Sequence, residues 1–132
     1  MSFRKVRNAH KTENTEDYLE LIAELLNLKG EARIVDIANE LGIAQATANK
    51  TIKRLQQQGF IKRKPYRSIF LTVKGQIIAS KSKKRHNIVL EFLLNLGIDK
   101  KTASADAEGI EHHVSEKTLK KMERFNITKN RL

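Results

Sequence analysis

The stretch VDIANELGIAQATANKTIKRLQQQ, residues 35–58, decides the fold that the sequence predicts. Its first part predicts a short helix, whose apolar face consists of Val35, Ile37, Ala38 and Leu41. Gly42-Ile43 predicts a turn, and a longer helix is expected from about Gln45 to Gln58, ending at Gly59. Three residues of the longer helix are expected to face inward: Ala48, Ile52 and Leu55. A short helix, a glycine turn and a longer helix are typical of a helix-turn-helix module.

The flanking segments predict a winged version of this module. Phe60-Ile61 and residues 69–71 are two short strand candidates. Between them, residues 62–68 hold four bases and the only proline, which predicts a basic hairpin, or wing. Residues 32–34 are expected to be an extended link. Before it, a helix is expected from near Glu16, capped by Asn14 or Thr15, to Gly30. Its buried face is predicted to consist of Tyr18, Leu21, Ile22, Leu25 and Leu26.

The C-terminal half predicts further helices. Thr72 can cap a helix from Val73 to about Ser82. A separate helix ending at Gly97 has an apolar face of Ile88, Val89, Phe92, Leu93 and Leu96. Another begins at Asp99 or Ser104 and includes residues 106–113. A last one, capped by Ser115, turns Leu119, Met122 and Phe125 inward, and a brief polar tail follows from Asn126. The expected organisation is a flexible basic arm (1–14), a winged helix-turn-helix domain (15–80) and a helical region (81–132), which makes the fold mainly α.

The charge pattern predicts an anionic partner. The chain has 26 basic and 15 acidic residues and a formal charge of +11. Between Leu41 and Leu90 there is no Asp or Glu, whereas twelve Lys and Arg residues lie there. A field of one sign repels itself, so a nucleic acid or an anionic membrane is expected to neutralise it. We favour nucleic acid because the apolar residues of this stretch fit a packed core. No apolar run approaches the ~18 residues that cross a bilayer, so a cytoplasmic protein without membrane contact is expected.

The longer helix and the wing supply the candidate contacts to double-stranded DNA. The outward positions of the helix are Gln45, Thr47, Asn49, Lys50, Lys53 and Arg54. Gln and Asn can bond adenine in the major groove, and the bases can neutralise phosphates. The wing adds Lys62, Arg63, Lys64 and Arg67 for the phosphate backbone or the minor groove. Alternatively, such bases form an ordinary solvated face.

Acidic residues at the two ends of the chain suggest a metal site. Asp17 and Glu20 are three residues apart on a helix, and Glu108, Glu111 and His112 also share one helical face. Like charges on one face repel, and a bound cation would offset this cost. Oxygen ligands suit divalent manganese, and imidazole extends the choice to iron, nickel or zinc. With no cysteine, thiolate ligands, disulfides and a Cys nucleophile are excluded. Each group alone also fits a solvated helix face, and His86 alone a surface or core histidine.

Four motifs together resemble the manganese transport regulators of the diphtheria toxin repressor family. They are EDYLE (16–20), LTVKG (71–75), Arg85-His86 and DAEGIEHHVS (106–115), and the resemblance covers about Asn14 to Phe125. It implies a homodimer with an N-terminal winged helix-turn-helix and a C-terminal helical dimerisation and metal-binding region. It also implies two metal ions per subunit, bound by Asp17, Glu20, His86, Glu108, Glu111 and His112. The iron-responsive relatives use a sulfur ligand near the first helix, so Asp17 points to Mn²⁺, with Fe²⁺ as the alternative.

The expected function is a manganese-responsive repressor of manganese uptake genes, which binds a palindromic operator and is not an enzyme. Four ligand carboxylates carry −4 and two divalent ions carry +4, which avoids burying net charge. We weighed three alternatives. A metal-independent winged helix regulator would bind DNA equally with or without metal. A carboxylate-bridged metalloenzyme would need an open coordination position and a substrate pocket. An architectural DNA-binding protein would leave the carboxylate and histidine residues without a use.

Overall fold

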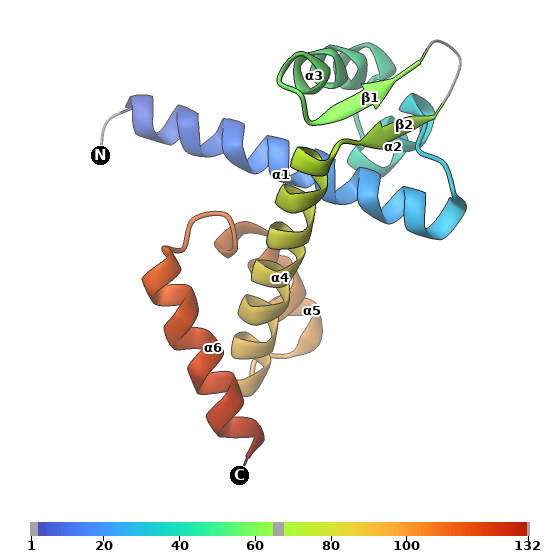
Figure 1. Cartoon of the computed structure of the whole chain (residues 1–132). Helices are drawn as coiled ribbons and strands as arrows, with labels where there is room; N and C mark the ends of the chain where they lie inside the picture. The colour runs from blue at the N-terminus through green and yellow to red at the C-terminus, as the bar shows by residue number, and fades with distance from the viewer. Residues whose placement is uncertain (1–2, 65–67, 132) are drawn as a thin grey trace. The chain divides into compact units, whose positions relative to one another are not determined.

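The chain is mainly helical, with one two-stranded hairpin (Figure 1). The computed structural model describes residues 3–64 and 68–131, with side chains from Asn14 onward. In chain order the elements are α1 (Phe3–Lys29), α2 (Ile34–Leu41), α3 (Gln45–Gln57), β1 (Ile61–Arg63), β2 (Ile69–Leu71), α4 (Val73–Asn95), α5 (Lys100–Ile110) and α6 (Glu116–Asn130). The chain divides into two compact units. The N-terminal unit is Asn14–Ser80, and the C-terminal unit begins at Lys81 and also includes the part of α1 before Asn14. The predicted fold class is thus confirmed.

Helices α1, α2 and α3 pack around the core of the N-terminal unit. The inward residues predicted for α3, Ala48, Ile52 and Leu55, are all fully buried. In α2, Ile37 and Ala38 are buried as predicted, but Val35, in the first turn of the helix, is 42% exposed, contrary to prediction. Gly42 ends α2 with a φ of 66°, a left-handed conformation that suits glycine. The turn between the two helices of the module is therefore set by this residue.

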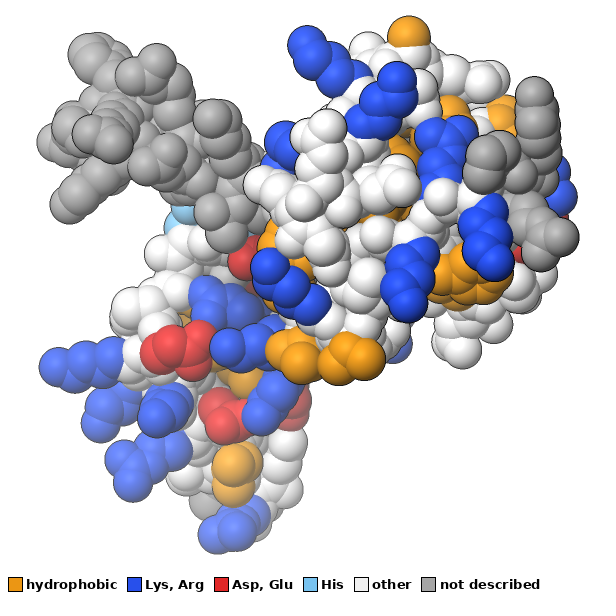
Figure 2. Space-filling model, turned by 45° about the horizontal axis from the view of Figure 1, so that its top comes forward, with side chains coloured by type: hydrophobic (Ala, Val, Ile, Leu, Met, Phe, Trp, Pro, Cys, Tyr) orange, Lys and Arg blue, Asp and Glu red, His pale blue; other side chains and the backbone are white. Residues whose placement is uncertain are grey.

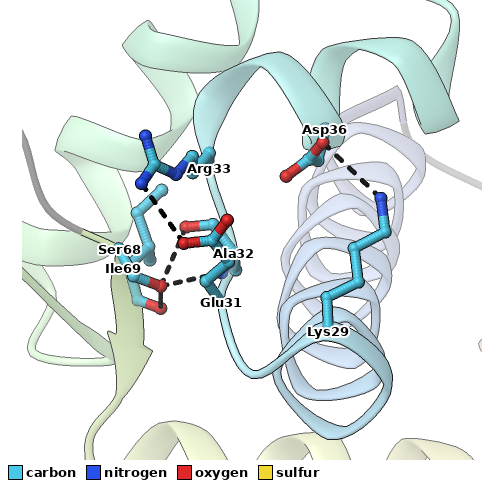
Figure 3. Close-up of polar contacts among 7 residues, drawn as sticks. All are labelled: Lys29, Glu31, Ala32, Arg33, Asp36, Ser68 and Ile69. Carbon is cyan, nitrogen blue, oxygen red and sulfur yellow. Dashed lines mark hydrogen bonds and ion pairs between the residues drawn. The ribbon is translucent and has the colours of Figure 1, made fainter.

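The link between α1 and α2 is joined to the hairpin (Figure 3). The Ile69 amide donates to the Ala32 carbonyl at 2.8 Å, and the Ala32 amide donates to Ser68 Oγ at 2.7 Å. On the other side of the link, Lys29 Nζ lies 3.7 Å from an Asp36 carboxylate oxygen. Strands β1 and β2 are antiparallel, with Lys62 opposite Phe70. These bonds fix the base of the wing, whose tip at residues 65–67 is outside the described residues.

The LTVKG motif is a tight junction between the hairpin and α4. Thr72 Oγ1 donates to the Gly59 carbonyl at 2.7 Å and accepts from the Gly75 amide at 3.1 Å. Lys74 Nζ donates to the Gln58 carbonyl and lies 4.7 Å from the centre of the Phe60 ring. A Cβ atom on Gly75 would lie only 2.1 Å from the Phe60 carbonyl oxygen. Only glycine lets the first turn of α4 lie this close to Phe60, the residue directly before β1.

Four local predictions are wrong. Helix α1 begins at Phe3 rather than near Glu16, so the described part of the expected arm is helical. Residues 73–95 form one helix rather than two. Both differences have one cause: neither stretch contains a glycine or proline at the expected break, and polar residues do not interrupt a helix. Helix α6 continues through the expected tail to Asn130. Finally, α5 ends at Ile110, so residues 111–113 form a turn and not the last part of the helix that was expected over 106–113.

The C-terminal unit packs α4, α5 and α6 around a second apolar cluster. Its buried residues are Ile88, Val89, Leu93, Ala103, Ala107 and Leu119. Asp99 caps α5 by accepting from the Thr102 amide, and this bond holds the pKa of the Asp99 carboxyl below its ordinary value. Ser115 caps α6, as predicted. Phe125 is 40% exposed, contrary to prediction, although its ring meets Phe92 edge to face.

Asn126 takes the buried place on α6 that was expected for its neighbour Phe125. It is 4% exposed, donates to the Ile88 carbonyl at 3.1 Å and accepts from Asn95 at 3.0 Å. Both the nitrogen and the oxygen of its side-chain amide therefore have a hydrogen-bond partner, as buried polar groups require. In the described part of the chain, no helix is long and apolar enough to cross a membrane.

Candidate metal centre and DNA-binding surface

The outer side of α3 and the hairpin carries the predicted DNA contacts. Gln45, Thr47, Lys50 and Lys53 are exposed on α3, and Lys62 and Lys64 are exposed on or beside β1. Among the charged side chains at the upper right of Figure 2, blue Lys and Arg greatly outnumber red Asp and Glu, which show only near the edges. The acidic residues of this unit all precede α3 in the sequence. Helix α3 and the hairpin therefore carry cations and no carboxylates of their own.

Two of the predicted DNA contacts also bond within the protein. Arg63 Nη1 donates to Asn49 Oδ1, which joins the wing to α3. The guanidinium of Arg54 donates to Asn14 Oδ1, Thr15 Oγ1 and Gln58 Oε1, each at 3.2 Å. Arg54 thus fastens α1 to α3, a structural role that sequence reasoning missed. Arg67 lies outside the described residues.

Three of the predicted metal ligands meet between α4 and the end of α5. Ligand atoms of His86, Glu108 and Glu111 all lie within 4.8 Å of one another. His86 Nδ1 is 2.7 Å from Glu111 Oε2 and 3.6 Å from Glu108 Oε1. On the other oxygen of the same carboxylate, His112 Nε2 is 3.2 Å from Glu111 Oε1. Glu111 is therefore the centre of the cluster, with one imidazole nitrogen at each carboxylate oxygen.

The burial of these atoms fits a cation. Glu111 is 1% exposed, the His112 side chain is fully buried, and the Glu108 side chain is 66% exposed. Among the described residues, His86 Nδ1 and both Glu111 oxygens are buried side-chain atoms without a hydrogen-bond partner. Lone pairs that face one another in a buried place are unfavourable unless a cation or protons lie between them. Carboxylate oxygen and imidazole nitrogen are the donors that manganese or iron accepts.

Asp17 and Glu20 lie one turn apart on α1, and both are partly buried. They belong to the N-terminal unit, whereas the other four predicted ligands belong to the C-terminal unit. Their part in metal binding stays a prediction. Arg85, quoted above only as a neighbour of His86, bonds to the backbone of Glu111. No period or spacing in the sequence marks that contact, because it depends on how α4 packs against the end of α5.

Comparisons with known proteins assign both halves of the chain. Residues 10–69 match the iron dependent repressor N-terminal DNA binding domain, and residues 72–127 match the iron dependent repressor metal binding and dimerisation domain. Transcriptional regulator MntR of Escherichia coli O6:H1 is 51% identical over 117 residues, which cover 89% of this chain and 76% of that protein. The HTH-type transcriptional regulator MntR of Lysinibacillus sphaericus is 36% identical over 79% of this chain and 75% of its own length.

Solved structures of metal-dependent transcriptional regulators have a similar fold. The manganese regulator SloR has a TM-score of 0.74 at 28% identity, over 84% of this chain and 52% of its own. A manganese-dependent transcriptional repressor in complex with manganese has a TM-score of 0.77 at 25% identity, over 85% of this chain and 52% of its own. This chain thus spans about half the length of these two structures. The two matched domains and the identity to the MntR proteins lead to one conclusion: the chain belongs to the iron-dependent repressor family, also called the diphtheria toxin repressor family, which consists of metal-dependent transcriptional regulators and not of enzymes.

Proposed function

We propose that this chain, a manganese-dependent transcriptional repressor of the MntR type, represses genes for manganese uptake when Mn²⁺ binds around Glu111. One observation carries the proposal. The buried Glu111 carboxylate meets the nitrogens of His86 and His112 at 2.7 and 3.2 Å, with no hydrogen bond to satisfy its oxygens within the described structure. The most economical occupant of such an arrangement is a divalent cation.

The proposed ligand set has six side chains. They are Asp17, Glu20, His86, Glu108, Glu111 and His112. The four carboxylates have a charge of −4, which two divalent ions per subunit would neutralise. All the donors are oxygen or nitrogen atoms and none is sulfur, so we favour Mn²⁺ over Fe²⁺. Binding by residues of both units would make the arrangement of α1 relative to the C-terminal unit depend on metal.

The DNA-binding half of the proposal concerns a homodimer in the cytoplasm on a palindromic operator. The matched domains imply DNA and a second copy of the chain as partners. In a helix-turn-helix dimer, the two recognition helices reach half-sites about 34 Å apart, or a multiple of that distance. Helix α3 would occupy the major groove, with Gln45, Thr47 and Asn49 near base edges. Lys50, Lys53, Arg54, Arg63, Lys64 and Arg67 would then lie near phosphates.

Metal and DNA are coupled in this proposal. If metal favours the conformation that binds DNA, DNA must tighten metal binding by the same factor. The coupling of a typical allosteric pair is about 1–3 kcal/mol, or roughly 5- to 150-fold in affinity. A metal-independent regulator would show no coupling between metal binding and DNA binding.

The test is a DNA-binding titration with an operator selected from random sequence, with Mn²⁺, with Mg²⁺ and with chelator at fixed salt. We expect at least about ten-fold tighter binding with Mn²⁺ and little change with Mg²⁺. Glu108→Gln should remove the gain, and because this side chain is exposed, the fold should survive. Asp106→Asn is the matched control, since it removes one exposed charge from the same helix. Equal binding with Mn²⁺ and chelator by the parent protein would refute the metal half of the proposal.

A further inference from the structure

Arg85 is the most extensively bonded cation of the described C-terminal unit. It lies on α4 directly before His86, and its side chain is only 18% exposed. Nε donates to the Glu111 carbonyl at 3.0 Å, and Nη2 donates to the Val114 carbonyl at 2.5 Å. Nη1 donates to Glu116 Oε1 at 2.6 Å. One guanidinium therefore joins the end of α5, the turn after it and the first turn of α6.

The two carbonyls need these donors. Both lie beyond the end of α5, and a backbone carbonyl outside a helix or strand must be satisfied by a side chain or by water. Helix α5 ends at Ile110, and the backbone then turns through Glu111 and Val114 before Ser115 caps α6. In this turn the Glu111 backbone is held on one side by Arg85, while its carboxylate points to His86 and His112. The bond that fixes the backbone thus also fixes where the carboxylate lies.

We propose that Arg85 is a positioning residue for the metal centre: by bonding the Glu111 and Val114 carbonyls it presets the Glu111 carboxylate between the two histidines. This inference rests on the proposed function, because it concerns the same site. It assigns to Arg85 no contact with the ion. The cationic fork is required because only a planar guanidinium offers donors in three fixed directions at once. A lysine at this position has one ammonium group and cannot reach both carbonyls and Glu116 in the same geometry.

The experiment compares four variants with the parent protein: Arg85→Gln, Arg85→Lys, Glu116→Gln and Lys84→Gln. Lys84 is the matched control, because it is an exposed base beside Arg85 on the same helix and its loss changes the net charge equally. Glu116→Gln removes the ion pair but leaves both carbonyl bonds. Binding of Mn²⁺ is measured by calorimetry, and the environment of the bound ion by its electron paramagnetic resonance spectrum. Circular dichroism melting in EDTA reports the metal-free fold.

We expect Arg85→Gln and Arg85→Lys to weaken Mn²⁺ binding by roughly 10- to 100-fold, the range for residues that orient metal ligands. The spectrum of the bound ion should also change, a readout that a general loss of stability would not move. Glu116→Gln and Lys84→Gln should stay close to the parent protein in both measurements.

Four results would overturn the inference. Parent affinity and an unchanged spectrum in Arg85→Gln would show that the guanidinium does not preset Glu111. If Arg85→Gln does not fold without metal, the Arg85→Lys variant decides instead. An Mn²⁺ affinity equal to that of the parent protein in Arg85→Lys would also show that the guanidinium does not preset Glu111. An equal loss in Lys84→Gln would assign the effect to net charge. Failure of the parent protein itself to bind Mn²⁺ would refute the proposed function, and the inference with it, and the parent titration alone identifies that case.

Discussion

Gly75→Ala should strongly destabilise the N-terminal unit, although alanine is ordinarily the better helix former. A Cβ at this position would lie 2.1 Å from the Phe60 carbonyl oxygen and 3.0 Å from its carbonyl carbon, whereas ordinary contact begins at 3.4 Å. The neighbour is backbone in the segment between α3 and β1 and cannot rotate away. The first turn of α4 must therefore retreat from the hairpin by about 1 Å or more.

The magnitude follows from the bonds that this retreat disrupts. Overpacking by one methyl group costs about 1–3 kcal/mol. Retreat also lengthens the bonds from Thr72 to Gly59 and from Lys74 to Gln58, each worth about 0.5–1.5 kcal/mol. The gain from replacing glycine within a helix is at most about 1 kcal/mol. The net loss is about 3 kcal/mol, a large share of the 5–15 kcal/mol that holds a typical domain folded.

Urea unfolding and thermal melting in EDTA measure this loss. Gly109→Ala is the matched control, because it is the same substitution within a helix but its Cβ would meet nothing within 4 Å. We expect Gly109→Ala to leave the metal-free protein as stable as the parent or up to about 1 kcal/mol more stable. If Gly75→Ala were also neutral or stabilising, the close approach of α4 to Phe60 would not exist in solution, and the account of the LTVKG motif would be wrong.

Four other changes test separate parts of the structure. Asn126→Ala should cost about 1–3 kcal/mol in urea unfolding, because it leaves the buried Ile88 carbonyl and Asn95 amide without this partner; a neutral result would mean that water replaces the amide. Asp99→Ala should destabilise the protein at neutral pH, with a difference that shrinks as pH falls below the ordinary value of 3.8: the pKa is lowered in the folded state, so the charged cap contributes above that range and is lost on protonation. A difference that grows on acidification would contradict the cap. Lys53→Gln should weaken DNA binding uniformly across sequences and reduce the slope of log affinity against log salt by about 1, and an unchanged slope would remove Lys53 from the phosphate contacts. Glu111→Gln should abolish the Mn²⁺ response and yet leave the metal-free protein at least as stable as the parent. The reason is that an amide avoids burying a charge and can donate to an imidazole nitrogen. A marked loss of metal-free stability would show instead that the carboxylate stabilises the fold without metal.

The periodicity of the sequence predicted the helix-turn-helix because local rules decide it. In α2 and α3 the apolar positions recur at helical spacing, and a glycine with positive φ stands between the two helices. Helical spacing grouped Glu108, Glu111 and His112 as candidate ligands, but only Glu108 lies on α5, because the helix ends at Ile110 and the other two follow in a turn. The meeting of His86 with Glu111 was not predictable from spacing, because it requires α4 to pack against the end of α5. Only the family resemblance joined them.

Helix boundaries and buried polar residues were less predictable. A polar run such as residues 80–85 is typical of a loop, but it also fits a solvated helix, and only tertiary packing distinguishes the two. Asn126 was placed in a polar tail because asparagine is ordinarily exposed. Its burial depends on two partners 31 and 38 residues earlier in the chain, both on α4. Arg85 and Arg54 were missed for the same reason: their bonds cross between elements, and their side chains look like any other member of a basic stretch.

The features that cost this chain stability coincide with the residues proposed to bind metal. Glu111 is an acid buried to 1% exposure, Glu108 stands one turn before it, and Gly109 lies between them although nothing in the described structure occupies the space of its Cβ. Arg85 donates its three hydrogen bonds to two backbone carbonyls and to Glu116, so it does not neutralise the Glu111 carboxylate. A chain selected for stability alone would pair that cation with the buried acid. Here Arg85 instead bonds the Glu111 carbonyl, and the Glu111 carboxylate faces two imidazoles. This arrangement makes physical sense if a second positive charge, which binds reversibly, completes the site.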